Sequence, residues 1–156
     1  MAPLTRANLG DFSSIVCFKS VITGMEDALG EKTTAISLIA AGRARGRFLA
    51  KSLGLSGSSN DLAKIAALLN EAVGQNGTRL TAVDNIVEEG GLIKVYCSET
   101  VCSAGEEIGS PRKCTFSMGA IWGALEEVTG KKLRGIHTES VLRGGTHDVF
   151  EFTQLD

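Results

Sequence analysis

The sequence predicts an α+β fold in which N-terminal helices pack on a four- to five-stranded antiparallel sheet. Three observations support this prediction. Apolar residues recur at helical spacing up to Gly77, they alternate with polar residues in the segments that follow, and helical spacing returns only once after that point. Helices and strands segregated in this way are typical of α+β proteins. The expected order is three helices, two strands, one helix and two strands (ααα-ββ-α-ββ).

Helix signals divide the first half of the chain into three segments. Residues 11–30 place apolar side chains near helical spacing and end at Gly30, which suits a C-terminal cap. Residues 31–55 are predicted to form a second helix that Gly54 ends. Residues 56–77 open on a Ser/Asn/Asp cluster, which favours an N-cap, and close at an Asn-Gly pair.

Strand signals dominate the second half. Residues 79–99 are predicted to form two strands joined by a hairpin at residues 89–91, where two glycines follow a glutamate. Residues 113–132 are predicted to form the fourth helix, and residues 133–155 two further strands around an Arg-Gly-Gly turn. No linker and no internal repeat divides the chain, so residues 1–156 are predicted to form a single domain.

The composition excludes several classes of protein. Sixteen Lys and Arg against 18 Asp and Glu leave a net charge of −2, which gives no electrostatic reason to expect a nucleic-acid partner. The longest apolar run, AISLIAA, is too short to span a bilayer, and the first residues lack the apolar core of a signal peptide. We therefore expect a cytoplasmic protein without a transmembrane segment, whose thiols stay reduced.

Three of the four cysteines, Cys97, Cys102 and Cys114, lie within the stretch YCSETVCSAGEEIGSPRKC. Their C-x4-C-x11-C spacing lacks the tight pairs of zinc sites, so a metal site made by these cysteines is the weaker alternative. Cys114, near a helix N-terminus, is also a candidate reactive thiol. The favoured interpretation is inward packing, as for Cys17 in the middle of the first helix.

The histidines give no clear catalytic pattern. His137 and Glu139 would project from one face of a strand, which can support acid–base chemistry, but a surface hydrogen bond is the favoured interpretation. The chain has no phosphate-binding loop and no G-x-G-x-x-G after a strand. The motifs therefore do not indicate an enzyme.

Two helical patterns have both a structural and a functional interpretation. The stretch GRARGR, residues 42–47, concentrates three arginines, for which a solvated or interface-rim helix is favoured over an anion site. Gly119 and Gly123 give the fourth helix a face of small residues, opposite a bulky face that includes Trp122. Close helix packing is the favoured role of this small face, and a wall that leaves room for a ligand is the alternative.

The C-terminal half has Cys97 at a strand end, the cysteine-led helix CTFSMGAIWGALEEVTGKKL, and the strand segment IHTESVLRGGTHDVFEF, which contains Glu139. In these three features the chain resembles the 4-vinyl-reductase-type domain, also called the hydrocarbon-binding domain. This family is a small-ligand-binding module related in fold to subunits of the vesicle-tethering TRAPP complex. The chain departs from it at Ser140 and Val149, where relatives often carry cysteines, which argues against a thiol-rich metal or redox role.

The resemblance implies that a small hydrophobic molecule binds in a cavity between helices and sheet, in a carrier, sensor or assembly module. The implied ligands are a tetrapyrrole such as a chlorophyll-like pigment, or a lipid with a fatty acyl chain; zinc is the weaker candidate. A homodimer formed through the helices is the implied assembly. The candidate ligand-binding residues are Phe18, Ile22, Cys114, Phe116, Trp122 and His137.

Two alternatives belong to other classes. An enzyme of tetrapyrrole or aromatic metabolism would use Cys114 or His137. A purely structural dimeric scaffold would have a filled core and no cavity of ligand size.

Overall fold

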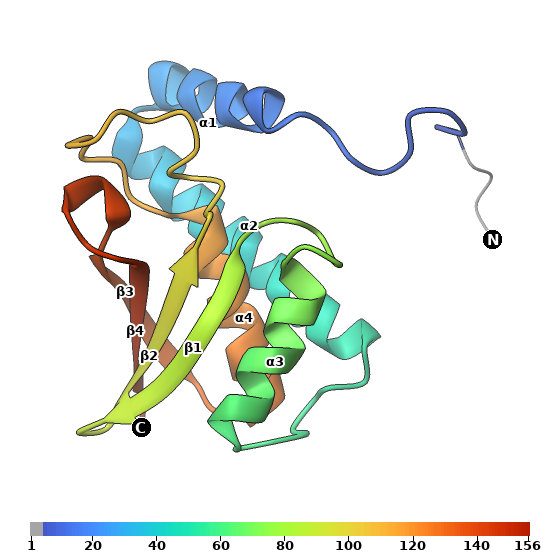
Figure 1. Ribbon diagram of the computed structural model, residues 1–156, viewed down its shortest axis with the longest axis vertical. Helices are drawn as coiled ribbons and strands as arrows, with labels where there is room; N and C mark the ends of the chain where they lie inside the picture. Colours follow the sequence, from blue (N-terminus) through green and yellow to red (C-terminus); the bar gives the residue numbers. More distant parts are fainter. Residues whose placement is uncertain (1–4) are drawn as a thin grey trace.

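Figure 1 shows the computed structural model, which describes residues 5–156. The order of the elements agrees with the sequence prediction, and no helix among these residues is long and apolar enough to cross a membrane. The elements are α1 (Ile15–Leu29), α2 (Glu31–Ser52), α3 (Leu62–Val73), β1 (Ala82–Glu89), β2 (Leu92–Ser98), α4 (Phe116–Thr129), β3 (Leu133–Glu139), a 3₁₀ helix η1 (Val141–Arg143) and β4 (Asp148–Gln154).

The strands form one antiparallel sheet in the order β1-β2-β4-β3. β1 and β2 make the predicted hairpin: Glu89 pairs with Leu92, and the two glycines between them have φ values of 57° and 83°. Both central residues of such a two-residue turn need positive φ, which glycine adopts without strain. β4 pairs with β2 on one side and with β3 on the other. Within residues 5–156 the sheet has four strands, the lower end of the predicted range.

Helix α4 lies at the centre of the molecule. It packs between α2 and the sheet, while α3 lies along β1 (Figure 1). The sheet meets these helices through side chains such as Phe150 and Phe152 of β4, which are fully buried together with Ile121 and Leu125 of α4. Most of α4 is therefore buried on several sides, which explains why its apolar residues show no single clean stripe.

Four glycines let α2 and α4 approach closely. Gly42 and Gly46 of α2 face Gly119 and Gly123 of α4, and a Cβ atom on any of the four would overlap the backbone of the opposite helix. At Gly46 the overlap would be with the carbonyl oxygen of Ala120. The predicted role of the small face of α4 in close helix packing is confirmed, and GRARGR supplies the matching glycines because residues four apart share a helix face.

Helix α1 packs at the edge of the molecule. Ser14 caps its N-terminus by accepting a hydrogen bond from the backbone N–H of Val16 at 3.2 Å. Ile22 is the buried residue of this helix, whereas Val16 and Leu29 on the predicted apolar face are 68% and 53% exposed. The thiol of Cys17 is also exposed, so the prediction that it packs in the core is wrong. Helical spacing identifies an apolar face, but it does not show whether another element covers that face.

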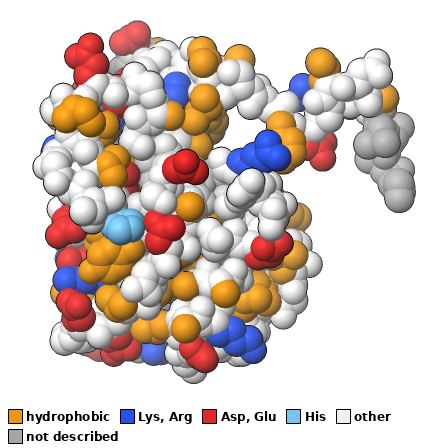
Figure 2. Space-filling model, viewed as in Figure 1, with side chains coloured by type: hydrophobic (Ala, Val, Ile, Leu, Met, Phe, Trp, Pro, Cys, Tyr) orange, Lys and Arg blue, Asp and Glu red, His pale blue; other side chains and the backbone are white. Residues whose placement is uncertain are grey.

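The residues before α1 form an arm, residues 5–14, that extends away from the body of the molecule. Figure 1 shows this arm leaving the helices, and Figure 2 shows it projecting from one side of the surface. Its last residues, next to α1, contribute to the pocket described below.

Candidate functional site

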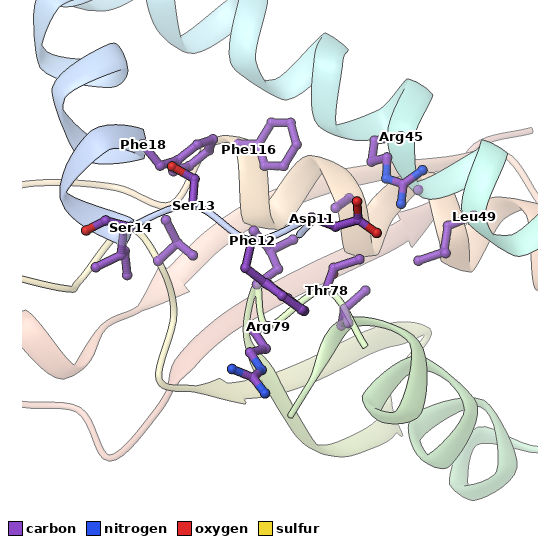
Figure 3. Close-up of a pocket in the computed structure, with 16 residues that line it drawn as sticks. Asp11, Phe12, Ser13, Ser14, Phe18, Arg45, Leu49, Thr78, Arg79 and Phe116 are labelled. Atoms are coloured by element: carbon purple, nitrogen blue, oxygen red, sulfur yellow. The ribbon is translucent and has the colours of Figure 1, made fainter. Parts of the chain in front are cut away.

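A pocket of about 490 Å³ lies between the arm and the helices (Figure 3). Its wall is formed by the end of the arm, α1, α2, α4, the turn between α3 and β1, and the loop after β2. A volume in this range suits a small-molecule ligand. Apolar side chains dominate the wall, namely Phe12, Ile15, Phe18, Leu49, Val73, Leu80, Val101, Phe116 and Ala120.

Two aromatic rings form one end of this pocket. The centroids of Phe18 and Phe116 are 5.5 Å apart and their planes meet at 68°, an edge-to-face contact. Phe18 lies in the first turn of α1 and Phe116 begins α4, so the contact joins two helices that are distant in sequence. The two rings provide an apolar surface against which a hydrophobic group can lose its hydration water.

Charged side chains also line the pocket. Arg45 of α2 and Asp11 of the arm lie on the side away from the two rings, and Arg79 after α3 lies beyond Phe12 (Figure 3). The guanidinium of Arg79 lies 4.8 Å from the ring centroid of Phe12, a cation–π contact that links the arm to the turn after α3. Arg79 has a φ of 56°, in the left-handed region, and its backbone N–H donates to the carbonyl of Gly74 at 3.0 Å.

Ion pairs fix the α1 side of the pocket. Lys19 donates to the carbonyl of Cys102 at 2.8 Å and to the carboxylate of Glu106 at 3.2 Å. Arg112 binds Glu106 as well and also pairs with Glu26 of α1 at 2.9 Å. Burial, together with the nearby Arg112, lowers the pKa of Lys19 to about 8. These contacts attach α1 to the loop between β2 and α4.

The structure places the six candidate ligand-binding residues in three different surroundings. Phe18 and Phe116 line the pocket. Ile22 is buried one turn after Phe18 and lines a small adjoining cavity with both rings. Trp122, Cys114 and His137 do not line the pocket.

Trp122 and the first arginine of GRARGR form a separate cluster between α2 and α4. The indole N–H donates to the carbonyl of Leu133 at 2.9 Å, and the guanidinium of Arg43 lies 4.3 Å from the ring centroid. Arg43 also donates to Glu126 at 2.7 Å. Trp122 is thus held by contacts inside the protein.

Cys114 and His137 belong to a buried hydrogen-bond network. The backbone N–H of Cys114 donates to Nδ1 of His137 at 3.2 Å, and Nε2 lies 3.0 Å from Oδ1 of Asp148. Because Nδ1 accepts a hydrogen bond, the ring proton lies on Nε2 and is donated to the carboxylate. The hydroxyl of Thr100 donates to Oδ2 at 3.2 Å. The side chains of His137 and Asp148 are 3% and 1% exposed, so a substrate has no path to this pair in this structure.

A disulfide bond joins Cys102 and Cys114. This contradicts the expectation of reduced thiols, which rested on the predicted location and not on geometry. Both residues are buried, as predicted, and the bond closes the loop between β2 and α4 with a sequence separation of 12. A C-x11-C spacing does not by itself predict a disulfide. The two cysteines can pair only because the loop after β2 folds back to the start of α4 and brings them close together.

The same region offers no set of free metal ligands. Cys114, His137 and Asp148 have potential ligand atoms within 4.8 Å of one another. The sulfur of Cys114 is bonded to Cys102, however, and both nitrogens of His137 take part in hydrogen bonds. Cys97 is not part of this group, and burial raises the pKa of its thiol to about 12, which disfavours the thiolate that binds metals.

Asp148 makes the stability of the fold dependent on pH. Burial raises the pKa of this carboxyl, but hydrogen bonds from His137, Ser140 and Thr100 outweigh burial and hold the pKa below its ordinary value of 3.8. A carboxyl whose folded-state pKa is lowered stabilises the fold at pH values above its unfolded pKa. This stabilisation is lost as the pH falls through the lower folded-state pKa.

We expect Asp148→Asn to lower the free energy of unfolding by about 2 kcal/mol at neutral pH, because buried donors lose an ionised acceptor. The variant is also expected to lose less stability on acidification than the wild type, as measured by urea unfolding at neutral and acidic pH. Asp84→Asn is the control, since Asp84 is exposed and lies 3.4 Å from His147 at the surface. Identical acid dependence of the Asp148 variant and the wild type would contradict the prediction.

Comparison with known proteins identifies the fold. No family model matches the sequence. The sensory domain of the phenol-responsive transcription activator PoxR, solved with phenol, is 13% identical with a TM-score of 0.68, covering 92% of this chain and 76% of that chain. A trafficking protein particle complex subunit 3 from Naegleria fowleri, covalently bound to palmitic acid, is 15% identical with a TM-score of 0.59, covering 91% and 93%. The chain shares the fold of these proteins.

A third solved structure links this fold to the resemblance found in the sequence. A vinyl-4-reductase family protein from Methanocaldococcus jannaschii is 20% identical with a TM-score of 0.52, covering 94% of this chain and 85% of that chain. The predicted likeness to the 4-vinyl-reductase-type and TRAPP folds is confirmed at the level of fold. At these identities the comparison speaks to the fold alone.

Several residues of the pocket were not predicted from the sequence. Phe12 falls in the segment predicted to form the first helix, but it lies in the arm and lines the pocket. Arg45 belongs to the arginine cluster GRARGR, which the sequence analysis singled out. The cluster did not indicate that one of its three arginine side chains lines a pocket. Arg79 had no signal in the sequence, because its position depends on a left-handed backbone conformation, with a φ of 56°, that is uncommon for a residue other than glycine.

Proposed function

We propose that this chain binds a small hydrophobic molecule in the pocket between the arm, α1, α2 and α4. The single observation that carries the proposal is the pocket itself, a groove of about 490 Å³ with a mostly apolar wall and a few charged groups. The groove is partly open to solvent, since Phe12 and Ile15 on its wall are 52% and 42% exposed, and a bound apolar molecule would remove these side chains from water.

Proteins with this fold support the proposal. One is a phenol-responsive sensory domain solved with phenol, and another is covalently bound to palmitic acid. Both ligands are apolar over most of their surface. A carrier, a sensor or an assembly module is the proposed role, because the pocket offers a binding surface for apolar groups.

The pocket wall predicts how affinity responds to mutation. We expect Phe18→Ala and Phe116→Ala each to weaken the binding of decanol, an apolar probe, about tenfold, because each removes an aromatic surface that desolvates the ligand. Isothermal titration calorimetry measures this change. Ile136→Ala is the matched control, since Ile136 is an exposed apolar residue on β3. Unchanged affinity in both phenylalanine variants, or no binding by the wild type, would contradict the proposal.

The ligand that accompanies the protein can be classified directly. Native mass spectrometry of the purified chain, with a visible spectrum of the same sample, separates the two classes implied by the resemblance. A tetrapyrrole adds a visible chromophore, and an acyl lipid adds mass without one. The same sample gives the zinc content, and one zinc per chain would favour the group formed by Cys114, His137 and Asp148 over the disulfide.

The helices also support the predicted homodimer. Val16 of α1 is 68% exposed, and Ile36 and Phe48 of α2 are 61% and 63% exposed. Burying such side chains against a second copy of the chain would remove apolar area from water, which is the reason to propose the homodimer. Sedimentation equilibrium would reveal a mass of two chains, and a monomer at high concentration would exclude this assembly.

A cytoplasmic location stays a prediction, and it bears on the disulfide. Disulfides are rare in a reducing cytosol. Labelling of free thiols in intact cells would show whether Cys102 and Cys114 are paired where the protein is made.

A further inference from the structure

We infer that the ligand of this pocket is amphipathic and monoanionic, with an ionised carboxylate bound by Arg45 and an apolar body directed toward Phe18 and Phe116. This inference rests on the proposed function, because it assigns the chemistry of the molecule that the same pocket holds. It follows from the distribution of charge along the wall.

The pocket separates its charged and apolar groups. Figure 3 shows Arg45 and Asp11 at one end and the rings of Phe18 and Phe116 at the other. An apolar molecule without a charge would fill the aromatic end and make no ionic contact with the guanidinium of Arg45, which is exposed to water. A molecule with one charged end and one apolar end matches both parts of the wall.

The two arginines on this wall are exposed and form no ion pair among residues 5–156. Several other exposed arginines in this range are also unpaired, so it is the position of Arg45 on the pocket wall that matters here. Arg45 instead packs over the ring of Phe48, with its guanidinium carbon 5.8 Å from the centroid. Its N–H groups are therefore available to a ligand, and a guanidinium pairs well with a planar carboxylate.

The charge balance of the wall favours a single negative charge. Arg45 and Arg79 contribute two positive charges, and Asp11 is the acidic residue that lines the same pocket. The sum is one positive charge, which a carboxylate neutralises and a dianionic phosphate would exceed. Arg79 lies beyond Phe12 in Figure 3, so it adds positive potential at the rim and Arg45 is the direct contact.

The test compares two probes that differ only at the head group. Decanoate and decanol share the apolar chain, and at neutral pH the acid is ionised. Isothermal titration calorimetry with the full chain should show decanoate binding about tenfold more tightly than decanol, the gain that a charge-assisted hydrogen bond typically gives. In Arg45→Gln this preference should disappear, while the affinity for decanol stays the same.

Arg47→Gln is the matched control. Arg47 lies two residues further along α2 and does not line this pocket. The preference for the acid should therefore persist in this variant. Circular dichroism and melting temperature confirm that both variants fold, so a lost preference reports on recognition and not on stability.

Each of the other possible results would contradict a specific claim. Equal affinity of the wild type for decanoate and decanol overturns the inference and leaves the hydrophobic pocket standing. A preference that survives in Arg45→Gln, or is lost equally in Arg47→Gln, also overturns it, because the selectivity then comes from other residues or from net charge. Failure of both probes to bind overturns the inference together with the proposed function.

Discussion

Gly46→Ala is expected to lower the free energy of unfolding by about 3 kcal/mol, among the larger effects of a single methyl group. The added Cβ would overlap the carbonyl oxygen of Ala120, which is backbone and has no rotamer with which to move aside. The two helices would have to separate, and separation would loosen the contacts on both sides of α4. The gain in helix propensity from alanine, about 1 kcal/mol, does not offset this cost.

Gly24→Ala provides the opposite control within the same protein. Gly24 lies in the interior of α1, and a Cβ atom there would meet no atom within 4 Å. This substitution is expected to stabilise the protein by about 0.5 to 1 kcal/mol, because it gains helix propensity without a clash. Denaturant unfolding measures both values. A neutral or stabilising Gly46→Ala would show that α2 and α4 do not approach as closely as described.

Removal of the disulfide is the second large effect. We expect the double variant Cys102→Ala/Cys114→Ala to lose about 3 kcal/mol of stability, since a bond across a sequence separation of 12 restricts the unfolded chain. The loop that it closes also carries the Lys19 contact to α1, so amide hydrogen exchange in residues 99–115 and in α1 should quicken. Thermal unfolding with and without dithiothreitol measures the stability change.

The reducing agent gives an internal check on this prediction. The wild type should fall to the melting temperature of the double variant when reduced, and the variant should not respond. Cys17→Ala, which changes an exposed free thiol, should behave as the wild type does. Four reactive thiols per denatured, unreduced wild-type chain would contradict the disulfide.

Local patterns predict much of this fold because local chemistry decides it. The hairpin between β1 and β2 follows from two glycines that tolerate positive φ, and the end of α4 follows from Gly130, which adopts a left-handed conformation with a φ of 71°. The small face of α4 could be assigned to helix packing because Gly119 and Gly123 lie four residues apart. Its partner was harder to identify, since Gly42 and Gly46 stand among arginines that suggest a solvated surface.

The site was less predictable because it is assembled from distant segments. Phe18 and Phe116 were selected as ligand-binding candidates, and they meet in the pocket because α1 docks on the start of α4. Trp122 and His137 were selected by residue type, but each is held by contacts elsewhere in the protein. The disulfide and the left-handed Arg79 depend on the path of loops, which periodicity does not describe.

The central claim is that an apolar molecule binds between α1, α2 and α4, and photolabelling tests it most directly. A decanol analogue with an alkyl diazirine, irradiated on the full chain and mapped by peptide mass spectrometry, marks the residues that contact it. We predict label on Phe18, Leu49 and Phe116, and competition by unlabelled decanol. Label confined to exposed apolar residues such as Val16 and Ile36, without competition, would contradict the claim.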